Sequence, residues 1–95
     1  MGNYKLTEDA KDDLRGIYRY GFERFGEVQA DLYFDALFNH FEKIAQNPHL
    51  YQAVDHIRKG YRRSVCGVDS IFYRVVDGTV EIISILSRQD FDNIL

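Results

Sequence analysis

The chain of 95 residues is long enough for one compact domain and too short to hold a second hydrophobic core. Hydrophobic residues make up 45% of it and aromatic residues 15%, which excludes intrinsic disorder as the default state. The formal net charge of -3 hides an asymmetry, because residues 58–88 carry six Lys or Arg against three Asp or Glu. A basic C-terminal half suggests a local surface for an acidic or anionic partner more than general nucleic-acid binding.

Several classes of protein are disfavoured by what the sequence lacks. No apolar run approaches the roughly 18 residues of a membrane helix, and the first residues lack the apolar stretch of a signal peptide. We therefore expect a soluble, cytoplasmic protein in which residues 1–95 form one domain. Cys66 is the single cysteine and cannot form an intrachain disulfide, and His40, His49 and His56 lack metal-ligand spacing. The sequence thus predicts no metal and no other cofactor.

The chain begins with a short predicted strand, residues 3–6, followed by two helices that form an antiparallel hairpin. Thr7 is an N-cap hydroxyl followed by two acidic residues, and apolar residues then recur at steps of three and four as far as about Arg24. Gly26 ends this helix, and a second runs over 27–46, where Asn47-Pro48 stops it. The predicted buried stripes are Ala10, Leu14, Ile17, Tyr18, Gly21, Phe22 and Phe25 in the first helix and Val28, Leu32, Tyr33, Ala36, Leu37, Phe41 and Ile44 in the second.

The second helix has more apolar residues than one neighbour can cover, because Phe34, Phe38 and Ala45 lie beyond its stripe. Tyr20 lies off the stripe of the first helix. Exposed aromatic patches mark partner sites, so Tyr20, Phe34 and Phe38 are candidate partner-binding residues. The alternative is that the loop 47–58 folds over them.

After Pro48 the pattern changes to β-rich runs at 61–66, 71–76 and 80–86, which predict three antiparallel strands. Together with the strand at 3–6 on one edge, the order is β-α-α-β-β-β, an α+β fold with the helical hairpin packed on a small, mainly antiparallel sheet. Asp77-Gly78 is a type I′ hairpin signal, so Arg74 should lie opposite Glu81 as a cross-strand ion pair.

The face of the sheet that each strand residue occupies follows from the same alternation. If the preceding turn centres on Val68-Asp69, Arg63 lies opposite Arg74 on the outer face, beside Phe72 and Ile83. The other face should meet the helices with Cys66, Ile71, Tyr73, Val75, Val80, Ile82 and Leu86.

Arg62, Arg63, Arg74 and Arg88 could supply the cations of a ribonuclease, which also needs a general acid or base beside them. The alternative is that Arg74 serves Glu81 and that the others are solvated. The three histidines fall in or after the second helix and none is on a strand, and Ser87 has no visible His or Asp partner. The residues therefore favour a binding protein.

A series of segments in order resembles the ParE branch of the RelE/ParE toxin superfamily. They are YKLT at 4–7, AKDDL at 10–14, GYRRSVCG at 60–67, IFYRV at 71–75, VEII at 80–83 and ILSRQD at 85–90, and they cover nearly the whole chain. The resemblance implies a toxin of a type II toxin-antitoxin module, with a small antiparallel sheet packed on a helical hairpin and a ParD-like antitoxin as its partner. We expect this antitoxin to bind the surplus apolar surface of the hairpin at Tyr20, Phe34 and Phe38.

Within that superfamily, RelE-like members cleave messenger RNA on the ribosome, whereas ParE-like members poison DNA gyrase and have no recognised nuclease site. In this chain Ser87 occupies the position after the last strand where RelE-like members often have a His. Phe91 occupies a position where a hydroxyl or imidazole could have served as the acid or base. The resemblance therefore implies inhibition of DNA gyrase by binding to the gyrase A protein and without catalysis, with no membrane and no sequence-specific nucleic-acid contact of the toxin alone. Target-binding residues on this interpretation are Arg62, Arg63, Arg74, Arg88 and Phe91.

Two rival functions stay open. One is a RelE-like endoribonuclease toxin that uses Arg63, Arg74 and Arg88. The other is an interaction module whose basic sheet binds an acidic partner without toxicity. For Phe91 and the residues after it, the alternative to target contact is that they cover the chain's own sheet around Phe72 and Ile83.

Overall fold

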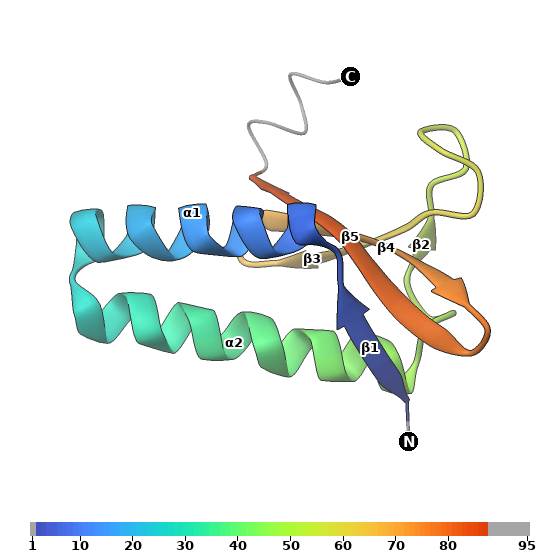
Figure 1. Cartoon of the computed structure of the whole chain (residues 1–95), viewed down its shortest axis with the longest axis horizontal. Helices are drawn as coiled ribbons and strands as arrows, with labels where there is room; N and C mark the ends of the chain where they lie inside the picture. The colour runs from blue at the N-terminus through green and yellow to red at the C-terminus, as the bar shows by residue number, and fades with distance from the viewer. Residues whose placement is uncertain (1, 88–95) are drawn as a thin grey trace.

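The computed structural model describes residues 2–87. The elements are β1 (Asn3–Leu6), α1 (Glu8–Phe25), α2 (Glu27–Gln46), β2 (Gln52–Ala53), β3 (Arg62–Cys66), β4 (Asp69–Val76) and β5 (Thr79–Ser87). The strand order is β1-β5-β4-β3-β2, with β1 parallel to β5 and the other neighbours antiparallel. The two helices form an antiparallel hairpin against one face of this sheet, as Figure 1 shows. The predicted α+β fold is confirmed, with the two-residue β2 as an addition that is too short to give a sequence pattern.

The helix boundaries agree with the predictions from capping residues. The Thr7 hydroxyl accepts a hydrogen bond from the Ala10 backbone N–H at 3.1 Å and donates one to the Ile83 carbonyl at 2.8 Å. The cap therefore also fixes the start of α1 against β5. Gly26, with φ at 91°, is the single residue between the helices. Neither helix is long and apolar enough to cross a membrane, as far as residues 2–87 go.

The predicted buried stripes are right near the sheet and wrong at the hairpin tip. Leu14 and Leu37 are buried, but Phe25, Val28 and Leu32 are 62%, 71% and 59% exposed. Phe22 and Ala36 are also exposed. The physical reason is that the hairpin extends beyond the edge of the sheet, so that among residues 2–87 the tip packs only against the other helix (Figure 1).

Phe34 and Phe38 do not project as an exposed pair. Both are half-buried against the main core, where their ring centroids are 5.0 Å apart and Phe38 lies 5.3 Å from Phe41. Of the loop after α2, Tyr51 also packs against the main core. Val54 of the same loop instead packs with Phe72 in a second, smaller cluster on the outer face of the sheet.

The β4–β5 hairpin has the predicted register. Asp77 and Gly78 have φ of 51° and 77°, as a type I′ turn requires, and Arg74 lies opposite Glu81. The β3–β4 pairing is shifted from the prediction, because Arg63 lies opposite Phe72 rather than Arg74. The turn is formed by residues 67–68, one position earlier than assumed, since Asp69 already pairs with Cys66.

A β-bulge changes which face the end of β5 presents. The register shifts between Phe72 and Tyr73, so that their partners on β5 are Ser84 and Ile82 and Ile83 is left over. Beyond the bulge, the alternation of helix-facing and outward-facing side chains along β5 is reversed. Ile85 is therefore 3% exposed in the main core, and Leu86 packs in the smaller cluster of the outer face, contrary to the prediction that Leu86 meets the helices.

Candidate partner-binding surfaces

The arginines predicted to bind a target have different surroundings. Arg62 donates hydrogen bonds to the backbone carbonyls of Tyr51, at 2.7 Å, and His49, at 3.4 Å. Its guanidinium thus holds the loop after α2 against β3. Arg63 lies on the outer face and donates to the Ser70 hydroxyl at 3.1 Å. The structure therefore separates Arg62, which has a structural role, from the outer-face arginines.

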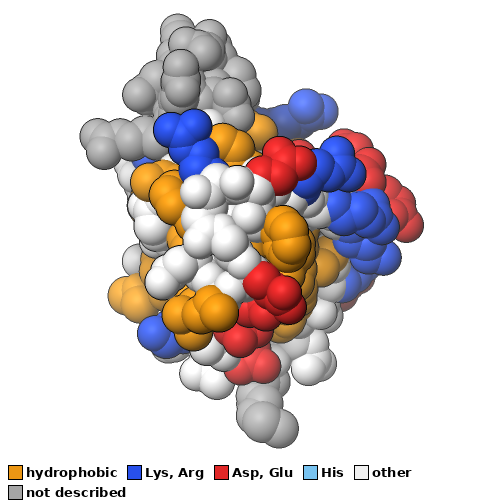
Figure 2. All heavy atoms as spheres, turned by 90° about the vertical axis from the view of Figure 1, so that its left-hand side faces the viewer, with side chains coloured by type: hydrophobic (Ala, Val, Ile, Leu, Met, Phe, Trp, Pro, Cys, Tyr) orange, Lys and Arg blue, Asp and Glu red, His pale blue; other side chains and the backbone are white. Residues whose placement is uncertain are grey.

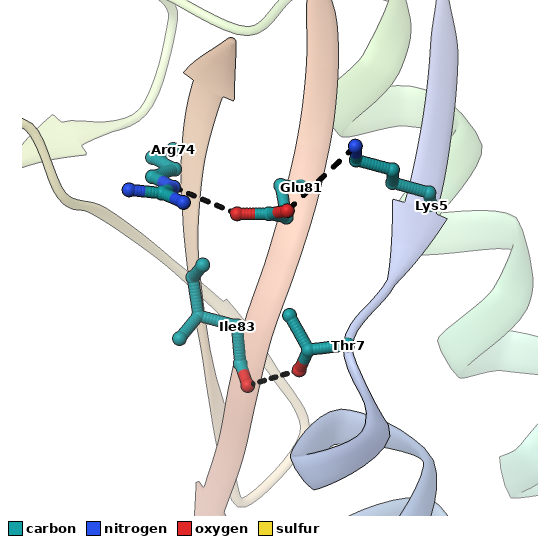
Figure 3. Close-up of polar contacts among 5 residues, drawn as sticks. All are labelled: Lys5, Thr7, Arg74, Glu81 and Ile83. Atoms are coloured by element: carbon teal, nitrogen blue, oxygen red, sulfur yellow. Dashed lines mark hydrogen bonds and ion pairs between the residues drawn. The ribbon is translucent and has the colours of Figure 1, made fainter.

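Arg74 belongs to a row of charges across three strands of the outer face, drawn in Figure 3. Its Nε lies 2.7 Å from Glu81 Oε1, which confirms the predicted ion pair. Lys5 on β1 approaches the other oxygen of the same carboxylate, with Nζ 3.8 Å from Oε2 (Figure 3). The Arg74 side chain is 49% exposed, so part of its guanidinium remains accessible to a partner. Arg88 and Phe91 lie outside the described residues.

His40 faces the helix-covered side of the sheet, away from the outer-face arginines. Its Nε2 lies 2.6 Å from the hydroxyl of Ser64, which is 3% exposed, and burial lowers the pKa of the imidazole. Cys66 is half-buried, and burial raises the pKa of its thiol. A raised pKa disfavours the thiolate, so Cys66 suits packing rather than nucleophilic attack. Among residues 2–87, no group of His, Cys, Asp and Glu is arranged to hold a metal ion.

The side chain of Tyr33 on α2 packs on the β3–β4 turn and forms hydrogen bonds with it. Its hydroxyl lies 2.5 Å from Asp69 Oδ2 and 2.9 Å from the Cys66 carbonyl, and burial together with the Asp69 carboxylate raises the pKa of the phenol. The ring covers Gly67, where a Cβ would lie 2.8 Å from Tyr33 Cε1. The turn is therefore fixed against the hairpin, and it forms one wall of the surface described next.

A groove of about 890 Å³ lies beside the helical hairpin, and we call it the hairpin groove. Its walls come from α1, α2, the β3–β4 turn and the end of β5. The residues are Asp12, Asp13, Gly16, Ile17, Tyr18, Tyr20, Gly21, Phe25, Gln29, Ala30, Tyr33, Phe34, Val68, Asp69, Ile85, Leu86 and Ser87. This set contains three acids and, among the described residues, no Lys or Arg. All three acids already have partners within the chain: Asp12 pairs with Arg15, Asp13 accepts from the Ile85 backbone N–H, and Asp69 accepts from Tyr33. The groove therefore favours a partner segment with apolar side chains.

Two of the three predicted partner-binding residues lie in the hairpin groove. Tyr20 is 58% exposed on its wall, and Phe34 lines it while half-buried. Phe38 does not line it. The view onto the hairpin tip in Figure 2 has hydrophobic side chains exposed between acidic and basic ones. The sequence prediction missed the small residues Gly16 and Ala30 and placed Gly21 in a buried stripe, and two glycines inside one helix were the available signal for the groove.

A helical hairpin packed against one face of a mixed five-stranded sheet defines a small α+β protein. Residues 4–90 match the model of a protein family that is described as the ParE toxin of the type II toxin-antitoxin system, parDE. The chain belongs to this family. It is 35% identical over 91 residues to Toxin ParE1 of Mycobacterium tuberculosis, covering 94% of this chain and 93% of the relative. It is 41% identical over 88 residues to Toxin ParE1 of Caulobacter vibrioides, covering 93% and 91%.

Solved structures with low sequence identity share the fold. A chain of the chromosomal ParDE toxin-antitoxin system from P. aeruginosa has a TM-score of 0.80 at 20% identity, over 92% of this chain and 96% of that one. A chain of the toxin-antitoxin complex RelBE2 from Mycobacterium tuberculosis has a TM-score of 0.62 at 18% identity, over 92% and 98%. These likenesses agree with the family assignment and support the architecture alone.

Proposed function

We propose that this ParE-type toxin inhibits DNA gyrase by binding to the gyrase A protein, and that a ParD-like antitoxin neutralises it. The observation that carries the proposal is the family match over residues 4–90, together with two relatives named Toxin ParE1. The family describes type II modules, in which the toxin has an antitoxin partner. A chain of the ParDE system from P. aeruginosa with a TM-score of 0.80 is consistent with that partner.

The hairpin groove is our candidate for the antitoxin site. An apolar groove whose three acids are already paired within the chain suits a segment that carries apolar side chains. Tyr20 is an aromatic side chain at its rim, and aromatic residues are frequent among those that dominate binding energy. Phe34 contributes from the floor, where it contacts Tyr18 edge to face at 5.3 Å. Phe38, which packs on the core, then acts by supporting Phe34.

The outer face of the sheet is our candidate for the target site. Arg63 and Arg74 lie on this face with Lys5, which makes a basic surface only partly neutralised by Glu81. We assign Arg88 and Phe91 to the same function from the sequence. Arg62 supports the loop beside this face rather than the contact itself.

Binding without catalysis is supported by the chemistry around the arginines. Within residues 2–87, their polar contacts include backbone carbonyls, a serine hydroxyl and the Glu81 carboxylate. His40, whose imidazole pKa is lowered by burial, is hydrogen-bonded to Ser64 on the opposite face of the sheet. A proton-transfer group that contributes about 100-fold to 10,000-fold in rate should instead lie within hydrogen-bond reach of the reacting atoms.

The test compares gyrase supercoiling with ribosome-dependent messenger RNA cleavage by the purified chain. Inhibition of supercoiling without RNA cleavage is the expected result. Arg74→Ala and deletion of residues 88–95 should weaken inhibition, whereas the control Arg19→Ala, on exposed α1, should not. His49→Ala and His56→Ala should also leave it intact.

Two outcomes would contradict this function. RNA cleavage with supercoiling unaffected would favour the RelE-like nuclease. Neither activity, with antitoxin binding retained, would favour a plain interaction module. Loss of antitoxin binding in Tyr20→Ser but not in Arg74→Ala would support separate antitoxin and target surfaces.

A further inference from the structure

The loop between β2 and β3, residues 54–61, is closed on itself at the end of the molecule that is farther from the hairpin tip (Figure 1). At its neck the backbone N–H of Val54 donates to the Tyr61 carbonyl at 2.8 Å. Inside it the Asp55 carboxylate accepts a hydrogen bond from the Gly60 N–H, also at 2.8 Å. These bonds hold the backbone of the β2–β3 loop in one shape.

Apolar residues anchor the β2–β3 loop on the outer face of the sheet. Val54 is 1% exposed, and Ile57 and Tyr61 pack against the small cluster that it forms with Phe72. Between these anchors Arg58 and Lys59 are exposed. The loop therefore presents two adjacent cations on a fixed frame, so that less conformational entropy is lost when they bind an anion.

The charge of the β2–β3 loop continues that of the outer face. Residues 54–63 contain four Lys or Arg and one acid, Asp55, which is already hydrogen-bonded to a backbone N–H. Arg62 lies opposite Tyr73 in the sheet, so the next residue of β4, Arg74, lies beside the base of the loop. The basic surface of the outer face thus extends to the tip of the loop.

The composition of the loop tip disfavours a protein as the occupant. The centre of a protein interface is apolar and depleted of charge. Residues 55–60 contain one large apolar side chain, Ile57, and it packs in the cluster on the sheet. The exposed tip is therefore polar and cationic, which suits phosphates. Duplex DNA carries one phosphate charge for about every 1.7 Å of its axis, so a convex cationic tip meets a phosphate at any position along it.

The surroundings of the loop also disfavour unpaired bases as its ligand. Single strands are held by stacking of their bases on exposed aromatic rings. In the part of the chain that the structure describes, the exposed aromatic rings of Tyr20, Phe22 and Phe25 all lie on α1. The Tyr61 ring is half-buried, and the Arg58 guanidinium lies over it with Cζ 6.0 Å from the ring centroid. A duplex, whose bases stay stacked, fits this surface better than a single strand.

We infer that the β2–β3 loop is a contact site for the phosphate backbone of duplex DNA, with Arg58 and Lys59 as the residues that bind phosphate. The inference goes beyond the proposed function, because the ligand is DNA and not the gyrase A protein. Such a contact reads no base sequence. The net charge of -3 opposes binding to DNA, so the contact should be weak and most evident at low salt.

The test measures the Kd of the full-length chain for a fluorescein-labelled duplex of about 20 base pairs by anisotropy, from about 20 to 200 mM salt. We expect Arg58→Gln and Lys59→Gln each to reduce the slope of log Kd against log salt by about 1. Arg58→Lys should keep the slope, because lysine still supplies one positive charge. Two duplexes of unrelated sequence should bind equally.

Arg24→Gln is the matched control. Arg24 is likewise an exposed arginine over a tyrosine, with Cζ 5.8 Å from the Tyr20 ring centroid, but it lies near the hairpin tip. It should leave the slope unchanged. Thermal melts of each variant within a few degrees of the parent exclude misfolding as the cause of a difference.

Three results would overturn the inference. The first is no binding by the parent chain at about 20 mM salt, or loop variants that behave as Arg24→Gln does. The second is tighter binding of a single-stranded RNA of the same length, which would assign the loop to unpaired bases. The third is tighter binding of a labelled polyglutamate of equal charge, which would assign it to an acidic protein. Because the assay contains no gyrase, each of these results leaves the proposed function standing.

Discussion

Glu81 on β5 lies between two cations, Arg74 on β4 and Lys5 on β1. The geometry allows the strength of the Arg74–Glu81 ion pair to be predicted. Arg74 Nε lies 2.7 Å and Lys5 Nζ 3.8 Å from the two carboxylate oxygens of Glu81, with side-chain exposures of 49% for Arg74, 60% for Lys5 and 17% for Glu81. Because water reaches both cations, the Arg74–Glu81 coupling should be about 0.2 to 1 kcal/mol. Arg74→Ala should therefore lower the free energy of unfolding by about that amount.

The adjacent residue Ile82 provides the comparison. It is 0% exposed in the main core, so Ile82→Ala loses buried contacts and leaves a cavity that together cost about 2 to 5 kcal/mol. Urea denaturation of the full-length chain measures both variants, and a double-mutant cycle with Glu81→Ala isolates the pair. In about 1 M salt the Debye length falls to about 3 Å, so the coupling should shrink. A cost for Arg74→Ala equal to that of Ile82→Ala would refute the reasoning and would mean a desolvated arginine.

Three further predictions concern single side chains. Burial lowers the pKa of His40 below 6.5, so on acidification the unfolded chain binds a proton at a higher pH than the folded chain does. The free energy of unfolding therefore has its full value above pH 6.5 and decreases as the pH falls from there toward the folded-state pKa. Urea midpoints across this range should show that slope, and His40→Gln should reduce it. Gly67→Ala should lower Tm more than Gly60→Ala, because both glycines have positive φ but only Gly67 would place its Cβ 2.8 Å from Tyr33. The Cys66 thiol should react with a disulfide reagent much more slowly in the native chain than in urea, and equal rates would contradict the burial that raises its pKa.

The helices and their ends follow from local chemistry. Thr7 caps α1 through its own side chain, Gly26 has the positive φ that other residues avoid, and Pro48 ends the pattern of α2. These effects act within a few residues, so the sequence predicts them well. The same holds for Asp77-Gly78, whose preference for a tight turn sets the register that pairs Arg74 with Glu81.

The candidate surfaces were predictable only in part. Periodicity marks a residue as apolar on one side of a helix, but it cannot say how far a sheet extends beneath that helix. Leu32 was therefore expected in the core and lies exposed, whereas Phe34 was expected outside and is half-buried in the hairpin groove. The groove itself needs four elements that are distant in sequence, so no local pattern reports it.

The sequence by itself determined the two helices, every strand except β2, their order and the family, because caps, turns and short motifs are encoded by residues close together in the chain. Tertiary structure alone decided the shift of Arg63 onto Phe72, the bulge that turns Ile85 toward the helices, and the use of Arg62 to hold a loop. Each of these is a compromise among packing contacts made by several strands and helices at once. Such contacts depend on which distant segments meet, and their free energy exists only after the hairpin and the sheet have come together.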